Sequence, residues 1–145
     1  METLVPKDAT SDNEIEKCFD VMSELRPHLE RSKFLHTVRE MESHGFKLAY
    51  IEDANTVVAV AGYRIAQNLF LGKHLYIDDI VTSQNIRSKG YGDTLYKWLR
   101  KKAQNTGCTH IHLDSAVHRG DTHRFYFRQG LTISSFHFRE KLVDL

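Results

Sequence analysis

The segment Arg87-Ser88-Lys89-Gly90-Tyr91-Gly92 combines residue types and a spacing that suit binding of a phosphate or pyrophosphate group. Gly90 and Gly92 lack side chains, so a ligand can approach the backbone closely there. Apolar residues at helical spacing follow, and the first amides of that helix, at its positive dipole end, would face the same segment. Arg87 and Lys89 add positive charge for the same anion. The segment therefore predicts a phosphate-binding loop that leads into a helix.

Two other phosphate-binding motifs do not fit this segment. A Walker loop requires Gly-x-x-x-x-Gly-Lys-Ser/Thr, which is absent here. A dinucleotide fingerprint requires Gly-x-Gly-x-x-Gly after the first strand, but Leu95 stands in place of the third glycine and the segment lies past the middle of the chain. Taken alone, Gly-x-Gly before a helix can also be only a tight turn, so the surrounding elements have to support the interpretation.

The hydrophobic periodicity predicts an alternation of strands and helices around this loop. The expected elements, in chain order, are a strand over 3–8, two helices that begin at the Ser11/Glu14 capping box and end at Gly45, strands over 46–52, 56–66 and 75–82, a helix from Tyr91 to Gly107, a strand over 109–115, a helix over 119–129 and one or two strands over 131–142. We expect one α/β (α+β) domain over residues 1–145, of order β-α-α-β-β-β-α-β-α-β. Its mixed sheet of six to seven strands would carry helices on both faces, since the β-α-β crossover requires a parallel pair.

Two motifs of this chain resemble those of the GNAT N-acetyltransferase superfamily. Arg87-x-x-Gly90-x-Gly92 resembles the family's Gln/Arg-x-x-Gly-x-Gly/Ala motif, which binds the coenzyme A pyrophosphate. The segment Phe125–Leu131 resembles the family's Tyr-x-x-x-Gly-Phe segment, with Leu131 in place of Phe. The element order agrees over essentially the whole chain. The resemblance implies a GNAT fold and transfer of an acetyl group from acetyl-CoA to a primary amine of a small molecule or protein by direct attack.

The resemblance also implies which residues hold coenzyme A. The strand before the loop would pair its backbone with the pantetheine arm, and the loop would hold the pyrophosphate. The implied residues are Ile80, Val81, Thr82, Arg87, Ser88, Lys89, Gly90, Tyr91, Gly92, Asp93, Thr94, Arg119 and Tyr126. Two positions depart from the family pattern: Ser88 replaces a small residue or Gly, and Arg119 stands where the last helix often starts with Asn.

Acetyl transfer needs a base for the amine and an acid for the leaving thiolate. By the resemblance, Tyr126 is the acid toward the coenzyme A sulfur; the alternative is a core aromatic. Asp79, Asp78 and Asp114 are the candidate bases, or else structural hydrogen-bond acceptors. Period-2 alternation predicts that Asp78 and Asp79 point to opposite faces of their strand, one of them toward the acceptor cleft. Two histidines near the last helix are further candidates, or bystanders: His118 and His123.

The acceptor pocket is expected between the first two helices, the connection 66–74 and the C-terminal strands. These segments contain charges of both signs, at Arg26, Arg31, Glu40, Glu42, Arg64, His137 and Arg139. This mixture does not identify a substrate. The alternative function is a catalytically inactive acyl-CoA-binding or interaction domain on the same fold, because a fold does not determine function.

Composition excludes several other classes of protein. The 145 residues are 41% hydrophobic and 27% charged, with a net charge of +1, so neither a nucleic-acid partner nor a membrane span is expected. Cys18 and Cys108 form no disulfide framework, and His110 and His112 lack further ligands at metal-binding spacing, so no metal is expected. We expect a cytoplasmic protein, and a possible homodimer through an exposed C-terminal edge strand.

Overall fold

The computed structural model describes residues 4–86 and 89–144, except for the side chain of Ile86. The chain divides into two compact units, Met1–Leu113 and Asp114–Leu145. The elements are β1 (Lys7–Asp8), α1 (Asp12–Glu16), α2 (Phe19–Leu25), α3 (Arg31–Glu42), β2 (Phe46–Asp53), β3 (Thr56–Asn68), β4 (Gly72–Thr82), the 3-10 turn η1 (Gln84–Ile86), α4 (Tyr91–Asn105), β5 (His110–Leu113) and α5 (Gly120–Arg128). All but α5 belong to the first unit.

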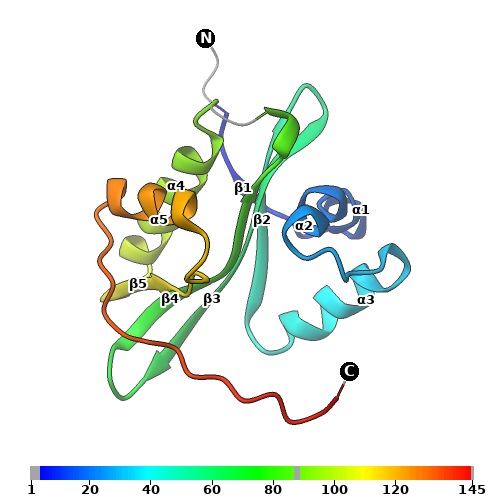
Figure 1. Cartoon of the computed structure of the whole chain (residues 1–145). Helices are drawn as coiled ribbons and strands as arrows, with labels where there is room; N and C mark the ends of the chain where they lie inside the picture. Colours follow the sequence, from blue (N-terminus) through cyan, green and yellow to red (C-terminus); the bar gives the residue numbers. More distant parts are fainter. Residues whose placement is uncertain (1–3, 87–88, 145) are drawn as a thin grey trace. The chain divides into compact units, whose positions relative to one another are not determined.

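The first unit is a five-stranded sheet of order β1-β2-β3-β4-β5 with helices on both faces. Strands β1 to β4 pair antiparallel, and β5 pairs parallel to β4 after the α4 crossover. Helices α1, α2 and α3 lie on one face of the sheet and α4 lies on the other (Figure 1). This arrangement confirms the predicted mixed sheet with one parallel pair.

Alternate residues of the strands fill the two sides of the sheet. On the α1–α3 side, Phe46, Leu48 and Tyr50 of β2 pack with buried residues of the helices such as Ile15 and Phe34. On the α4 side, Tyr63 of β3 meets the ring of Trp98 edge-on, with centroids 6.3 Å apart. The face to which a side chain points therefore decides which helices it meets.

The N-terminal capping box forms as the sequence predicts. The Glu14 amide donates to the Ser11 hydroxyl over 3.1 Å, and the Glu14 carboxylate accepts from the Ser11 amide over 3.0 Å. The predicted single helix behind it is wrong, however, because the structure has α1 and α2 there. The Cys18 amide bonds to the Ile15 carbonyl instead of the Glu14 carbonyl, and this tighter turn separates the two helices.

The number of strands is lower than predicted. Residues 131–144 contain no strand, and β1 covers only Lys7–Asp8 of the expected 3–8. The C-terminal segment has apolar residues suited to a strand, but Phe136 and Phe138 are 85% and 91% exposed. A strand forms only when its backbone pairs with a neighbour, and no such pairing forms for residues 131–144. The sheet of the described residues therefore has five strands instead of six to seven.

Candidate active site

The predicted phosphate loop meets α4 at Gly90, whose backbone is in the left-handed conformation that glycine adopts without strain. Gly90 is the N-cap of α4, with φ of 80° and ψ of 10°. A side chain at such a φ is strained, which explains why glycine stands there. The Thr94 amide and hydroxyl both bond to the Gly90 carbonyl, at 3.0 Å each. The first turn of an α-helix contains no carbonyl acceptors for its own amides, so the amides at the start of α4 suit an anion. Arg87 and Ser88 lie outside the described residues.

Residues on both sides of the loop are held by the rest of the first unit, Tyr91 by β2 and Gln84 by α2. The Tyr91 hydroxyl donates to Asp53 at the end of β2 over 2.6 Å, which raises the pKa of Tyr91. The Gln84 amide donates to the Glu24 carboxylate of α2 over 2.8 Å. Asp93, in the first turn of α4, pairs with Lys97 at 3.0 Å. The side chains of Tyr91 and Asp93 are thus engaged with the protein itself.

Beside the loop, the outer edge of β4 pairs with no described strand. Strand β5 pairs only with residues His74 to Ile77 of β4. Beyond that point Ile80, Val81 and Thr82 pair with β3 on one edge, and no described strand pairs with the other edge. An unpaired strand edge of this kind can bind an extended ligand through its backbone groups. The predicted pairing of this strand with the pantetheine arm stays a prediction.

A bulge in β4 changes the predicted orientation of the aspartates. Gly62 pairs with Asp79, but the next residue Tyr63 pairs with Ile77, so Asp78 is the extra residue of a β-bulge. Regular alternation would place Asp78 and Asp79 on opposite faces, and this prediction is wrong. Both carboxylates lie on the α1–α3 side of the sheet, as their two arginine partners demonstrate.

Each aspartate binds an arginine from a different element. Asp79 accepts from Arg26, at the end of α2, with Nε and Nη2 at 2.7 and 2.6 Å from Oδ1. Asp78 accepts from Arg64 of β3, with Nε and Nη2 both at 3.0 Å from Oδ1. Arg64 is two residues from Gly62, whose missing side chain faces Phe46 on the α1–α3 side, so Arg64 also points to that face.

Gly62 leaves room for this group of charges. A Cβ at Gly62 would lie 2.6 Å from the Phe46 ring and 3.5 Å from the Asp79 Oδ2 atom.

The pKa of Asp78 is raised by burial, which outweighs the lowering by Arg64; the nearby Asp79 charge raises it further. A carboxyl with a raised pKa holds its proton more strongly and is a better base when ionised.

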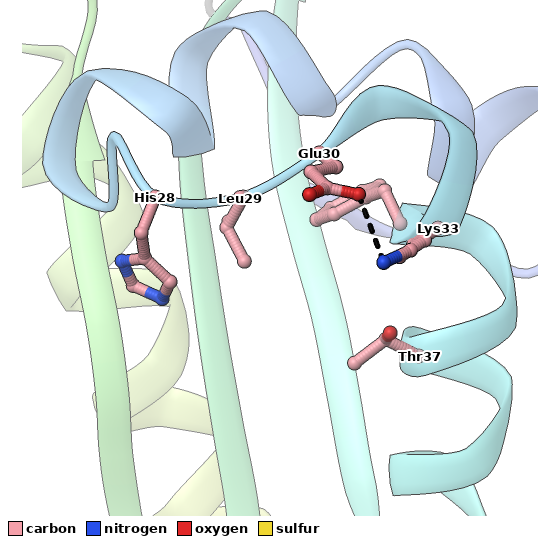
Figure 2. A pocket seen from close by; sticks show the side chains of 6 residues that line it. His28, Leu29, Glu30, Lys33 and Thr37 are labelled. Atoms are coloured by element: carbon pink, nitrogen blue, oxygen red, sulfur yellow. Dashed lines mark ion pairs between the residues drawn. The ribbon is translucent and has the colours of Figure 1, made fainter. Parts of the chain in front are cut away.

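A pocket of about 230 Å³ opens on the same side of the sheet. Residues of the α2–α3 connection and the first turns of α3 line it (Figure 2). The lining residues are His28, Leu29, Glu30, Lys33, Phe34 and Thr37. Glu30 and Lys33, three residues apart at the start of α3, form an ion pair of 3.1 Å in its lining. The connection begins immediately after Arg26, so the pocket adjoins the Arg26–Asp79 pair along the chain.

His74 and Tyr76 of β4 and His112 of β5 form a group of ring contacts next to the two aspartates. His74 Nδ1 lies 2.8 Å from His112 Nε2, so one ring donates a hydrogen bond to the other. The Tyr76 ring lies edge-on to His112, with centroids 5.0 Å apart, and Arg64 stacks over Tyr76 at 5.4 Å. His74, Tyr76 and Asp78 therefore share one face of β4.

The second unit holds the remaining predicted residues. Tyr126 lies in α5, and burial raises the pKa of its hydroxyl while the positive charge of Arg119 lowers it.

Asp114 lies just beyond β5 instead of within the predicted strand, 3.6 Å from His137. His123 Nε2 bonds to the Ala116 carbonyl over 2.8 Å. Gly130, with φ of 93°, ends the turn after α5, in agreement with its place in the predicted motif.

Comparison with known proteins identifies the family. The sequence profile of the acetyltransferase (GNAT) family matches residues 12–131. The chain belongs to the GNAT family. It is 32% identical over 136 residues to the uncharacterised N-acetyltransferase YhdJ of Bacillus subtilis, covering 92% of this chain and 96% of the relative. The sequence-based assignment to GNAT N-acetyltransferases is thus confirmed.

Solved GNAT structures share the fold. Glucosamine-6-phosphate N-acetyltransferase of Arabidopsis thaliana superposes with a TM-score of 0.79 at 20% identity, covering 98% of this chain and all (100%) of that chain. Aminoglycoside N-acetyltransferase AAC(6')-Iy, solved with coenzyme A, superposes with a TM-score of 0.82 at 12% identity, covering 98% of both chains. At these identities the likeness establishes the fold alone, and the chemistry has to be argued from the residues of this GNAT chain.

Sequence reasoning did not single out the residues that line the pocket. The pocket residues His28, Lys33 and Thr37 carry no motif, and only Pro27 indicated an irregular connection there. Among the expected acceptor residues, Arg26 and Arg64 do meet the β4 aspartates. Arg31 instead pairs with Asp20. Glu42 pairs with Arg39, Glu40 with His36, and His137 lies near Asp114.

Proposed function

We propose that this N-acetyltransferase binds a primary amine beside Asp78 and Asp79 and transfers to it the acetyl group of acetyl-CoA by direct attack. One observation carries the proposal: two arginine-held carboxylates lie on β4 directly before the stretch Ile80 to Thr82, whose outer edge pairs with no described strand. At about 3.3 Å per residue, Ile80 lies roughly 7 Å beyond Asp78 along the strand. An amine and a thioester bound at these two places would be close enough to react.

Coenzyme A would occupy the unpaired outer edge of Ile80 to Thr82 and the start of α4. The amides of Tyr91, Gly92 and Asp93 would bind the pyrophosphate, because their positive dipole end faces the loop. The backbone of Ile80 to Thr82 would pair with the pantetheine arm, and one of its amides would bond to the thioester oxygen and stabilise the oxyanion. Arg87, Ser88, Lys89 and Arg119 complete the proposed contacts with the phosphates.

Asp78 is the base that this arrangement favours. A primary amine has a pKa near 10, so at neutral pH it arrives protonated and must lose a proton. One oxygen of Asp78 is held by Arg64, and the other accepts no bond in the described part of the chain. That second oxygen would take the proton, directly or through a water molecule, and the neutral amine nitrogen would then attack the acetyl carbon. The nitrogen would give up its second proton to solvent as the amide forms. Asp79, likewise held through one oxygen, would orient the ammonium group, and Asp114 remains an alternative base.

Tyr126 completes the proposed reaction as the acid. When the tetrahedral intermediate collapses, the carbon–sulfur bond breaks and the thiolate leaves with the electron pair. The Tyr126 hydroxyl would give its proton to that sulfur and regain one from solvent. Its raised pKa keeps the hydroxyl protonated at neutral pH, as this role requires.

The test is acetylation of a panel of primary amines, followed by mass spectrometry of the product. Asp78→Asn should abolish most of the turnover without weakening coenzyme A binding, measured by calorimetry. Asp121→Asn is the matched control, because Asp121 is 97% exposed and pairs with Arg124 of the same helix. Coenzyme A binding with no acetylation of any amine would instead support the catalytically inactive alternative.

The homodimer also stays a proposal. The exposed Phe136 and Phe138 in the C-terminal segment suit contact with a second copy of the chain. Light scattering should give twice the mass of the chain, and replacing both residues by Ser should return the mass of one copy. A wild-type protein with the mass of one copy would refute it.

A further inference from the structure

We infer that the acceptor is a zwitterion, a primary amine whose short carbon chain also carries a carboxylate, phosphonate or phosphate group. The inference rests on the proposed function, because it places the amine beside Asp78 and Asp79. It adds a second recognition element, the pair Arg26 and Arg64, and a substrate class that the acetyl transfer itself does not require.

The charges at this site are arranged in two layers. The side chains of Asp78 and Asp79 are 17% and 16% exposed, whereas those of Arg64 and Arg26 are both 46% exposed. The negative groups therefore lie deep, at the sheet, and the positive groups lie nearer the solvent. A ligand that extends its ammonium group to the carboxylates leaves the rest of its chain beside the two guanidinium groups.

Each arginine has donors left for such a ligand. Arg26 and Arg64 both use Nε and Nη2 toward one carboxylate oxygen, and Nη1 bonds to no group in residues 4–86 and 89–144. A guanidinium group has five N–H donors, and it binds carboxylate and phosphate oxygens well. The Tyr76 ring, under the Arg64 guanidinium at 5.4 Å, holds its plane in place. The site thus offers fixed donors for an anionic group.

The same layers disfavour a polycationic acceptor. A second ammonium group on the ligand would meet Arg26 and Arg64 at the outer layer, where like charges repel. In the neighbouring pocket, Glu30 is already neutralised by Lys33 at 3.1 Å. Neither place offers an uncompensated carboxylate to a further positive charge.

The experiment compares amines of similar length that differ in their second group. Propylamine has none, β-alanine has a carboxylate, aminoethylphosphonate has a phosphonate, and diaminopropane has a second amine. For the wild-type enzyme we expect kcat/KM to be about 10-fold or more higher for at least one zwitterion than for propylamine, and lowest for diaminopropane. The carboxylate and phosphonate arms distinguish the two kinds of anion.

Arginine variants give the second readout. Arg64→Gln and Arg26→Gln would also disturb the aspartates, and this loss affects all amines alike. The ratio of kcat/KM for the preferred zwitterion to that for propylamine removes the shared loss, and we expect the ratio to fall at least about 5-fold in one of the variants. Arg124→Gln, in an exposed ion pair of α5, should leave the ratio unchanged.

The outcomes separate this inference from the proposed function. Three results would overturn the zwitterion inference alone. The kcat/KM ratio of zwitterion to propylamine could be near one, neither arginine variant could change that ratio, or the enzyme could prefer diaminopropane. Acetylation of no amine at all would overturn the proposed function, and the inference with it.

Discussion

Asp78 and Asp79 follow each other in one strand, yet both carboxylates lie on the same face of the sheet. The bulge opposite Gly62 and Tyr63 inserts Asp78 as an extra residue, so the alternation of side chains is interrupted there. Arg26 and Arg64 each neutralise one of the two charges. Two adjacent carboxylates would otherwise repel each other, and the arginines make this local structure tolerable.

Replacing the proposed base should remove the acidic limb of the pH–rate profile. The pKa of Asp78 is raised by burial, so its active, ionised form accumulates only at higher pH than for an ordinary aspartate. The rate of the wild-type enzyme should therefore rise with pH through that raised pKa. Asp78→Asn should lower kcat/KM at neutral pH by about 100-fold or more and flatten this limb. An unchanged limb in the variant would assign the base to another residue.

A side chain at Gly90 should strain the start of α4. The φ of 80° costs an L-residue about 1–2 kcal/mol, although no described residue lies within 4 Å of a Cβ there. Gly90→Ala should therefore lower the free energy of unfolding by about 1 kcal/mol in urea titrations. Gly120→Ala is the control, because Gly120 also has open space around it but no positive φ. Equal effects of the two variants would mean that backbone strain at Gly90 is unimportant.

Asp8 should contribute to stability through two partners beneath α4. The Tyr63 hydroxyl donates to Asp8 over 2.6 Å and Lys102 Nζ over 2.7 Å. Because the Tyr63 side chain is fully buried, Asp8→Ala leaves its hydroxyl without a partner, at a cost of about 1–3 kcal/mol in unfolding free energy. Asp12→Ala, which removes only an exposed ion pair with Arg39, should cost less than about 1 kcal/mol. The reverse order would contradict this role of Asp8.

The capping box should make the protein sensitive to acid. Hydrogen bonds from the Ser11 and Thr10 amides and from Tyr50 hold the pKa of Glu14 well below its usual range. Its ionised form therefore stabilises the folded state at neutral pH, and this stabilisation is lost as the pH falls below the usual glutamate pKa of about 4.3. Glu14→Gln should have a lower free energy of unfolding than wild type at pH 7. The difference between the two proteins should shrink when urea titrations are repeated at progressively lower pH. A difference independent of pH would contradict the linkage.

The two cysteines should react with thiol reagents at very different rates. Burial raises the pKa of the Cys18 thiol to about 12, and its Sγ donates to the Glu14 carbonyl over 3.3 Å. Cys108 is only partly buried. Iodoacetamide at pH 8 should therefore alkylate Cys108 first, as peptide mass spectrometry would show, while Cys18 reacts only on unfolding. Faster labelling of Cys18 would indicate that the core between α1 and β2 opens readily.

The sequence by itself determined the features that depend on neighbouring residues. The capping box of Ser11 and Glu14, the turn at Ala54 and Asn55 with φ of 51° and 65°, and the glycine at the start of α4 all follow from local conformational preferences. The apolar stripe of α4 likewise predicted its buried side, since Leu95, Leu99 and Ala103 are all buried. Together with the two motifs, these features were enough to identify the family.

The tertiary structure alone decided the arrangement of the β4 aspartates and the state of the C-terminal segment. A bulge arises from how β4 pairs with β3, and the sequence of one strand does not contain that register. Arg26 and Arg64 reach Asp79 and Asp78 only because folding places α2 over the face of the sheet to which the Arg64 side chain of β3 also points. Residues 131–144 have strand-forming side chains, but a strand also requires a partner, and pairing is a property of the fold.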